Sequence, residues 1–341
     1  MILASNIFGI DLGTSNIKIY NDDEETILNE KNIVAIKNKN VFFAVGDEAF
    51  EMYEKAPANI KVTYPMSNGV IADIKSMQLI LKKMLEKASK SILKNADYYI
   101  AVPTDITEVE KRAFYDLVEN ANVKAKRVFI TEKAIVDALG LGIDVTSSQG
   151  IMIVNIGADT TEISIVSLGG IVVSRLIKIG GNKFDEAIIN YIKRNFNFII
   201  GDKTAEVIKK ELANALEPDE SSAGVYGRDI VTGLPSELTI SSKVIYEAIS
   251  EPLHSIVDAA KVILERTPPE LGADIIRAGI YLTGGSSSIK GLDKMFNRET
   301  GLKVNVCDKP SESVARGFSK MINESAYKKL AYSTKNPNNI R

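Results

Sequence analysis

The chain of 341 residues contains one cysteine, one histidine and no tryptophan. Because Cys307 has no second cysteine to pair with, an intrachain disulfide is excluded, and a reducing compartment fits. Cys307 and His254 cannot supply the four ligands of a His/Cys zinc site within one chain. The net charge of −2 also lacks the basic excess typical of nucleic-acid-binding proteins. We therefore expect no disulfide scaffold, no such zinc site and no nucleic-acid partner.

Long apolar runs are also missing. No run approaches the roughly 20 residues that span a bilayer, and residues 1–7 lack the basic start and apolar core of a signal peptide. The chain does have 45% apolar and 25% charged residues, a balance that builds folded cores. Its length predicts two domains of ordinary size.

A strand, a glycine turn and a second strand occur twice in the chain. Residues 151–166 consist of two apolar runs around the polar turn GADTT. Residues 7–20 repeat this pattern, and IDLG at 10–13 corresponds to VNIG at 154–157. Backbone N–H groups in tight turns form anion-binding concavities. One such turn in each half of the chain suggests a duplicated fold that holds one phosphate chain from both sides.

Strands alternate with helices in the rest of the first half, which is typical of an α/β domain with a mixed or parallel sheet. An amphipathic helix is predicted at 73–91, and Thr107 with Glu110 forms a capping box at the start of another. Pro252 is expected to kink or divide a helix at 242–266, and Pro268-Pro269 is expected to break the chain after it.

Asp11 stands at the end of a strand, just before the first glycine turn. It is either an ordinary hairpin residue or a ligand of hydrated Mg²⁺, an ion that is usually held by one or two carboxylates together with substrate phosphates. In the second case, N–H groups of Thr14, Ser15 and Asn16 hold phosphate oxygens.

Two further groups have both a structural and a functional interpretation. Glu206 and Lys209 share one helix face and either pair with each other as solvated charges or flank a bound base and ribose. Their spacing alone does not favour the second interpretation. The turn at 284–287 is either an ordinary loop or a place where the backbone approaches a nucleoside and a helix N-terminus faces phosphate.

These motifs resemble the superfamily of actins, heat-shock chaperone ATPases and sugar kinases, and within it the MreB family of bacterial actins. DLGTSN at 11–16 resembles the first phosphate loop of that family, NIGADTTE at 155–162 the second, and LTGG at 282–285 the adenosine loop. The resemblance extends over nearly the whole chain, with its motifs in the right order, which is far more specific than one motif. Glu206 and Lys209 fall where the family contacts the nucleoside, which raises their functional interpretation.

The resemblance implies an α/β, actin-like ATPase fold, with two duplicated ribonuclease-H-like domains around a central nucleotide cleft and a smaller subdomain in each. The implied ranges are 1–143 with 310–325 for domain I, 144–309 for domain II, about 33–65 and 180–243 for subdomains IB and IIB, and 326–341 for a mobile tail.

The resemblance also implies a function. The chain is expected to bind ATP or ADP with Mg²⁺ and to polymerise, alone or with other MreB copies, into filaments at the inner face of the cell membrane. Such cytoplasmic filaments contribute to cell shape or motility. The implied metal residues are Asp11 and Asn155. The implied nucleotide-binding residues are Gly13, Thr14, Ser15, Asn16, Gly157, Ala158, Asp159, Thr160, Glu206, Lys209, Gly284, Gly285, Ser286 and Ser287.

Three departures from the family pattern concern catalysis. The family has Asp in place of Asn155, Glu-Pro in place of Lys133-Ala134, and two more glycines in place of Ala158-Asp159. The resemblance implies that the missing Glu orients the attacking water, with Thr161 nearby, and that the missing Asp helps to hold the Mg²⁺ shell.

The consequences follow from the side chains. Asn155 keeps an acceptor oxygen but loses the negative charge, and the Lys133 ammonium is a donor without an acceptor. Lys133 can pair with the γ-phosphate as a point charge but cannot activate water. Because a missing base costs about 10²–10⁴-fold in rate, we expect little or no ATP hydrolysis. Alternatively, Glu132 takes over the water and the chain is an ordinary active ATPase, although one residue turns a helical side chain by roughly 100°.

Membrane contact is a separate expectation. Ile92 and Leu93 resemble an exposed apolar loop that other family members insert into lipid, or they cap the core. Nearby lysines would gain roughly 1 kcal/mol each near an anionic surface. They are Lys82, Lys83, Lys87, Lys90 and Lys94.

Two alternative functions occur in the same superfamily. A sugar kinase would need a phosphoacceptor base, and none is identifiable. A heat-shock type chaperone would need a substrate-binding domain, and only a short tail follows Ile322.

Overall fold

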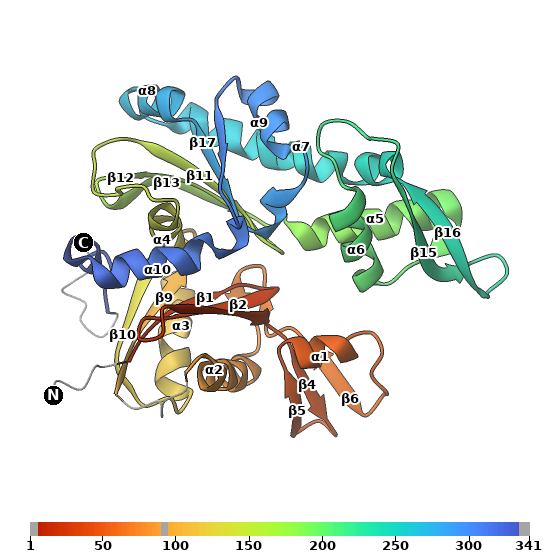
Figure 1. Ribbon diagram of the computed structural model, residues 1–341, viewed down its shortest axis with the longest axis horizontal. Helices are drawn as coiled ribbons and strands as arrows, with labels where there is room; N and C mark the ends of the chain where they lie inside the picture. The colour runs from red at the N-terminus through yellow and green to blue at the C-terminus, as the bar shows by residue number, and fades with distance from the viewer. Residues whose placement is uncertain (1–5, 90–94, 334–341) are drawn as a thin grey trace. The chain divides into compact units, whose positions relative to one another are not determined.

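A computed structural model describes residues 6–89 and 95–333 of the chain (Figure 1). It divides into two compact units. Unit 1 comprises Met1–Gln149, Val166–Ser174 and Glu312–Arg341, and unit 2 comprises Gly150–Ile165 and Arg175–Ser311. Our predicted boundaries, at 143/144 and 309/310, fall a few residues from these. A further difference is 166–174, which belongs to unit 1, where Leu168 N–H donates to Ser147 O (2.8 Å) and Gly169 N–H to Val145 O (2.6 Å).

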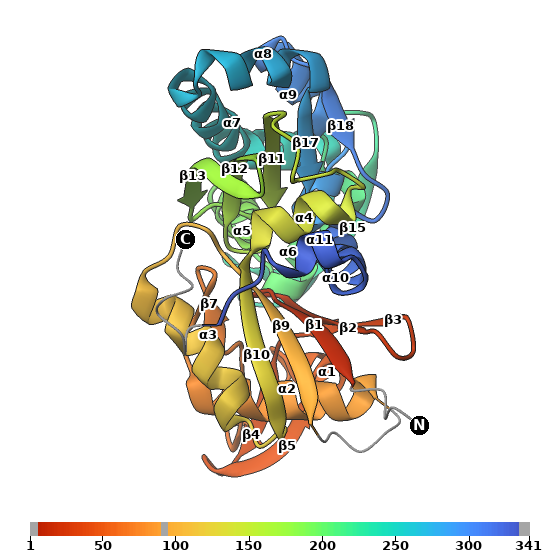
Figure 2. The ribbon, with the colours of Figure 1, turned by 90° about the vertical axis from the view of Figure 1, so that its left-hand side faces the viewer.

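Unit 1 is built on a five-stranded mixed sheet (Figure 2). In register, Ile10 lies opposite Ile19 of the antiparallel neighbour and opposite Ile100 of the parallel neighbour. The strand order is β10 (Ala125–Glu132), β9 (Ala96–Val102), β1 (Ile7–Leu12), β2 (Asn16–Asn21) and β3 (Thr26–Lys31).

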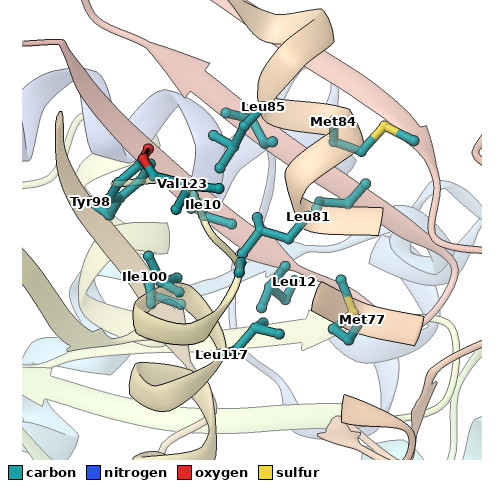
Figure 3. Packing of buried hydrophobic residues seen from close by; sticks show 14 of the residues in the cluster. Ile10, Leu12, Met77, Leu81, Met84, Leu85, Tyr98, Ile100, Leu117 and Val123 are labelled. Carbon is teal, nitrogen blue, oxygen red and sulfur yellow. Dashed lines mark hydrogen bonds between the residues drawn. The ribbon is translucent and has the colours of Figure 1, made fainter. Parts of the chain in front are cut away.

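Alternation along β1 divides its side chains between two faces of this sheet. Ile10 and Leu12 join the core formed with α2 (Ile74–Ala88) and α3 (Glu108–Asn120) (Figure 3). Gly9 and Asp11 therefore face the opposite side, where a Cβ on Gly9 would meet the Phe318 ring at 2.3 Å.

The helices begin where their capping residues predict. Asp73 caps α2 by accepting N–H groups from Lys75 and Ser76. The capping box predicted for Thr107 and Glu110 is present at the start of α3 and satisfies N–H groups that have no partner within the helix. In Figure 3, side chains of α2 point toward those of β1 and β9.

A smaller sheet with its own core lies within the range predicted for subdomain IB. Its strands are β5 (Val41–Val45), β4 (Val34–Lys37) and β6 (Ile60–Thr63), and α1 (Asp47–Met52) packs against them. The short hairpin β7 (Met66–Ser67) and β8 (Val70–Ile71) follows.

A second five-stranded sheet, which lies in unit 2 except for residues 166–174, repeats the order of the first. The order is β13 (Gly170–Ile177), β12 (Thr161–Ser167), β11 (Ile151–Ile156), β17 (Ile280–Thr283) and β18 (Val304–Val306). In each unit, three consecutive strands are followed by two reached through crossovers, and the first strand pairs in parallel with the fourth. Asp11 on β1 and Asn155 on β11 occupy corresponding positions, opposite Ala101 and Thr283. The predicted duplication is confirmed.

Helices and a second small sheet complete unit 2. The small sheet has the order β14 (Phe198–Ile199), β15 (Ser222–Asp229) and β16 (Pro235–Ser241). The helices are α5 (Gly181–Phe196), α6 (Asp202–Leu212), α7 (Ser242–Arg266), α8 (Pro269–Ala278) and α9 (Leu292–Thr300), with the 3₁₀ turn η1 (Gly285–Ser288).

Two differences from the sequence prediction concern prolines. Pro252 does not divide α7, which is assigned as one helix. We expected Pro268-Pro269 to break the chain, but Pro269 begins α8. Proline is favoured at the first helical position because no intrahelical bond needs its missing N–H.

The described part of the predicted mobile tail contains regular structure. After α10 (Ser313–Asn323), a short helix α11 (Ser325–Lys328) forms. Tyr332 then exchanges two backbone hydrogen bonds with Ile130 of β10, at 3.0 and 2.8 Å. Backbone pairing fixes this segment to the edge strand of the unit 1 sheet.

Candidate functional site

The first glycine turn is held by its own backbone and by side chains of unit 1. Gly13 N–H donates to Asn16 O (3.0 Å), and Asn32 Nδ2 donates to Gly13 O (2.8 Å). A Cβ on Gly13 would lie 2.7 Å from Asn16 O, so the closeness of the turn requires glycine. Lys31 Nζ lies 3.2 Å from Ser15 Oγ. The turn, which includes Thr14, is therefore held in shape by neighbouring residues of unit 1.

Asp11 is the buried centre of a three-residue ion cluster just before this turn. Lys133 Nζ lies 3.0 Å from Asp11 Oδ1, and Lys18 Nζ lies 3.2 Å from Asp11 Oδ2. The Asp11 side chain is only 4% exposed. Burial by itself raises the pKa of Asp11, but the charges of Lys133 and Lys18 together outweigh it and lower the pKa to about 2. Asp11 is thus an anion whose two oxygens each face an ammonium group.

Glu132 and Lys133 are adjacent in the chain but reach different partners. Lys133 is the first residue of α4 (Lys133–Gly140), and its side chain contacts Asp11. Glu132 is the last residue of β10 and accepts a hydrogen bond from Tyr332 Oη at 3.1 Å. Burial and then the Glu132 charge raise the pKa of Tyr332. Glu132 is therefore engaged with the C-terminal segment of unit 1.

The second glycine turn is closed by the same kind of backbone hydrogen bond as the first. Gly157 N–H donates to Thr160 O (2.8 Å), as Gly13 N–H does to Asn16 O. The start of α5 supports this turn, because Gly181 N–H donates to Gly157 O (3.0 Å) and Asn182 N–H to Ala158 O (2.7 Å). The predicted pair of equivalent turns is therefore present.

The polar side chains of the second turn also have partners in unit 2. Asp159 Oδ1 accepts from Asn182 Nδ2 at 2.6 Å. Thr161 is fully buried, and its hydroxyl donates to Ile179 O at 2.7 Å. Asn155 is half-buried at the end of β11. Asp159 therefore connects the turn to α5. The family pattern had predicted glycine at positions 158 and 159.

The two expected nucleoside residues of α6 pair with different partners. Lys209 Nζ lies 2.8 Å from Asp185 Oδ2 and donates to Gly181 O at 2.9 Å. Burial lowers the pKa of Lys209, against the attraction of Asp185. Glu206 instead pairs with Lys210 at 2.7 Å. Glu206 and Lys209 therefore do not pair with each other. Lys209 forms a buried pair with Asp185, and Glu206 forms an exposed pair with Lys210.

The glycine-serine turn packs against the second glycine turn. Gly284 has a φ of +82°, and a Cβ there would lie 2.4 Å from Ile156 O, so both conformation and space require glycine. Ser286 Oγ donates to Gly157 O at 2.9 Å, and Ser287 Oγ to Gly284 O at 2.8 Å. Gly285 begins η1.

Four segments far apart in the sequence thus meet in unit 2. A Cβ on Gly181 would lie 2.8 Å from Ser286 Oγ and 3.3 Å from Lys209 Nζ. Together with the bonds to Gly157, these distances bring the second turn, the start of α5, Lys209 and η1 into one region. The backbone groups of these segments and the buried ammonium group of Lys209 form one polar site, which we call the unit 2 cradle.

Three contributors escaped the sequence analysis. Lys18, for which we predicted no role, is buried beside Asp11. The available signal was hairpin register, since Lys18 lies directly opposite Asp11. Asp185 and Tyr332 offered no local signal, because their partners are 24 and 200 residues away.

The expected membrane residues Ile92 and Leu93 lie outside the described residues. Two of the lysines that we associated with them are paired, Lys83 with Glu86 at 2.8 Å and Lys87 with Glu30 at 2.9 Å. Within residues 6–89 and 95–333, no helix is long and apolar enough to cross a membrane. The same residues contain no cluster of three or more His, Cys, Asp or Glu that could hold a metal ion.

Comparison with known proteins identifies close relatives. A family model described as MreB/Mbl protein matches residues 5–330. The cell shape-determining protein Mbl of Bacillus subtilis is 41% identical over 318 residues, covering 92% of this chain and 95% of that protein. The cell shape-determining protein MreB of Escherichia coli K12 is 40% identical over 332 residues, covering 94% of each.

Solved structures agree with the sequence relatives. MreB5 of Spiroplasma citri bound to ADP superposes with a TM-score of 0.90 at 36% identity, covering 96% of this chain and 98% of that one. The same protein bound to AMPPNP gives 0.90 at 37% identity, with the same coverage. A MamK double helical filament gives 0.79 at 22% identity over 94% of this chain and 99% of that one, which shows a shared fold.

Proposed function

Because this chain belongs to the MreB/Mbl family of actin-like cell-shape proteins, we propose that it forms filaments, binds ATP and hydrolyses it slowly or not at all. A solved relative, MreB5 of Spiroplasma citri, binds ADP and AMPPNP. That supports adenine nucleotide as the ligand here. Paired turns with equivalent backbone bonds, one in each unit, support a triphosphate as the group they hold.

The nucleotide residues of the proposal are those of the two turns and of the unit 2 cradle. In the turns 13–16 and 157–160, the N–H groups of Gly13 and Gly157 close the turns, and residues 14–16 and 158–160 would offer backbone donors to phosphate. Lys209 and the turn at 284–287 would contact the nucleoside, since they meet beside Gly157 and Gly181. Glu206 would contribute from the same helix as Lys209.

Slow hydrolysis is supported by one observation above others: the Lys133 ammonium lies 3.0 Å from Asp11. An ammonium ion has no lone pair with which to orient or deprotonate water. Glu132, the alternative base, accepts a hydrogen bond from Tyr332. Thr161 donates its hydroxyl proton to Ile179 O. The described residues therefore favour ATP binding over turnover.

Mg²⁺ fits this chain poorly. Asp11 and Asn155 are the residues that would hold its water shell. Both oxygens of Asp11 face ammonium groups, and an amide replaces the second carboxylate. When bound, the ion would neutralise phosphate charge. The chain's own lysines already place positive charge beside the first turn.

Phosphate release from purified protein with ATP tests the proposal. We expect a rate about 10²–10⁴-fold below that of a family member with the catalytic Glu, as for loss of a general base. The double variant Lys133→Glu with Asn155→Asp should raise the rate. The control Lys126→Glu makes the same lysine-to-glutamate change at an exposed position of β10 and should not raise the rate. Turnover by the unmodified chain at ordinary actin-like rates would contradict slow hydrolysis.

For the cell, we propose filaments that lie at the inner face of the membrane and contribute to shape or motility. Assembly would involve copies of this chain, alone or with other MreB copies. The names of the curated relatives, which are cell shape-determining proteins, support this role.

A further inference from the structure

We propose that Lys18 and Lys133 take the place of the divalent cation, so that this chain binds ATP without needing Mg²⁺. The inference rests on the proposed ATP binding and concerns the same site. It is a property of unit 1 alone, because Asp11, Lys18 and Lys133 all belong to that unit.

The first step is geometric. Asp11 is fixed at the end of β1, Lys18 faces it across the β1–β2 hairpin, and Lys133 reaches it from the first residue of α4. Three separate elements thus hold the two ammonium groups at 3.2 and 3.0 Å from the two carboxylate oxygens. Gly13, which opens the phosphate turn, is two residues after Asp11.

The second step concerns charge. The carboxylate and the two ammonium groups together carry a net charge of +1, and all three side chains are at most 19% exposed. Charges shielded from water interact more strongly and are screened less by salt than charges on the surface. A cluster of this sign attracts a triphosphate and repels an incoming divalent cation.

The third step concerns chemistry. A protein-bound Mg²⁺ is usually held through carboxylates, with water filling its remaining positions. Asp11 offers its oxygens to ammonium groups instead. Lysine ammonium is a compact point charge that binds phosphate well. The positive charge that a triphosphate needs is therefore covalently part of the chain.

Binding measured with and without the metal tests the inference. Isothermal titration calorimetry would give the Kd for ATP in excess Mg²⁺ and, separately, in EDTA. We expect the two Kd values to agree within about threefold. Tight binding in Mg²⁺ that weakens more than about tenfold in EDTA would overturn the inference and leave ATP binding intact. Absence of binding in both buffers would overturn the proposed function itself.

Variants of Lys133 test whether this lysine is responsible for ATP binding without Mg²⁺. Lys133→Met should weaken binding in EDTA by about tenfold, because one of two charges beside the triphosphate is lost. Lys133→Glu should make binding depend on Mg²⁺. The control Lys126→Met removes a lysine from an exposed position of β10 and should change neither Kd. Equal effects of Lys133→Met and Lys126→Met would contradict a local role for Lys133. The comparison of buffers on the unmodified chain needs no variant to fold.

Discussion

Neighbouring residues of opposite charge separate at the junction of β10 and α4. Lys133 turns to Asp11, while Glu132 meets Tyr332 from the C-terminal segment. A shift of one residue where a strand becomes a helix changes side-chain direction, because the two elements have different periods. The residue type at position 133 and the direction of its side chain together decide that an ammonium group faces Asp11.

Protonation of Asp11 should remove its ion pairs with Lys18 and Lys133. Its pKa of about 2 in the folded chain lies below the ordinary value of 3.8, so its ion pairs stabilise the fold fully above about pH 4. That contribution, about 2 kcal/mol, should be lost progressively as the pH falls from about 4 through 2. Urea unfolding of the native chain and of Asp11→Asn, at a series of pH values, measures it. A stability difference that did not shrink on acidification would contradict the ion cluster.

Helices α4 and α10 approach each other so closely that side chains are excluded at their contact. A Cβ on Gly140 would lie 1.8 Å from Ser313 O, and one on Gly317 would lie 1.8 Å from Val136 O. Backbone oxygen atoms cannot move aside as a flexible side chain can. The glycines therefore let α10, from the end of the chain, pack on unit 1.

Gly317→Ala should accordingly destabilise the protein by about 3 kcal/mol, since the added methyl group overlaps the backbone of α4. Gly272→Ala is the matched control, because Gly272 lies within α8 and its Cβ would meet nothing within 4 Å. There, alanine should stabilise the helix by up to about 1 kcal/mol. Thermal unfolding followed by circular dichroism should show Tm falling for the first variant and rising for the second. Equal effects would contradict the close helix contact.

Two sheets with one strand order give the whole molecule its internal repeat. Equivalent hairpins then supply equivalent turns, and corresponding positions carry Asp11 and Asn155. The repeat is one of architecture, while the chemistry of the two halves has diverged: one has an ion cluster and the other a backbone cradle with Lys209.

Filaments should persist if ATP is not consumed. Electron microscopy of the protein with ATP is expected to show protofilaments that last as long as those formed with AMPPNP. Filaments of the double variant Lys133→Glu with Asn155→Asp should shorten as phosphate is released. Discrete monomers with either nucleotide would contradict self-association.

Membrane attachment is the second prediction at this scale. Serine at both Ile92 and Leu93 should reduce co-sedimentation with anionic liposomes, because two apolar side chains no longer enter the lipid. With Lys83 and Lys87 each paired with a carboxylate, electrostatic attraction alone should hold the variant less well. Unchanged binding would count against this loop.

Much of the fold was predictable because its signals are local. The capping box at Thr107, the amphipathic pattern of α2 and the two glycine turns depend on residues a few positions apart. Pro269 shows the limit of such signals, since one dipeptide can end a helix or begin one. The segment around Tyr332 was missed because its order comes from pairing with Ile130, which is distant in the sequence.

The sequence by itself determined the duplicated actin-like fold, the family, and the presence of Lys133 and Asn155 where the resemblance implies carboxylates. Only the tertiary structure decided where the charge of Lys133 goes and that Lys18 joins it. The physical reason is distance along the chain: side-chain identity is fixed locally, whereas the partner of a buried charge depends on which elements the fold brings within about 3 Å.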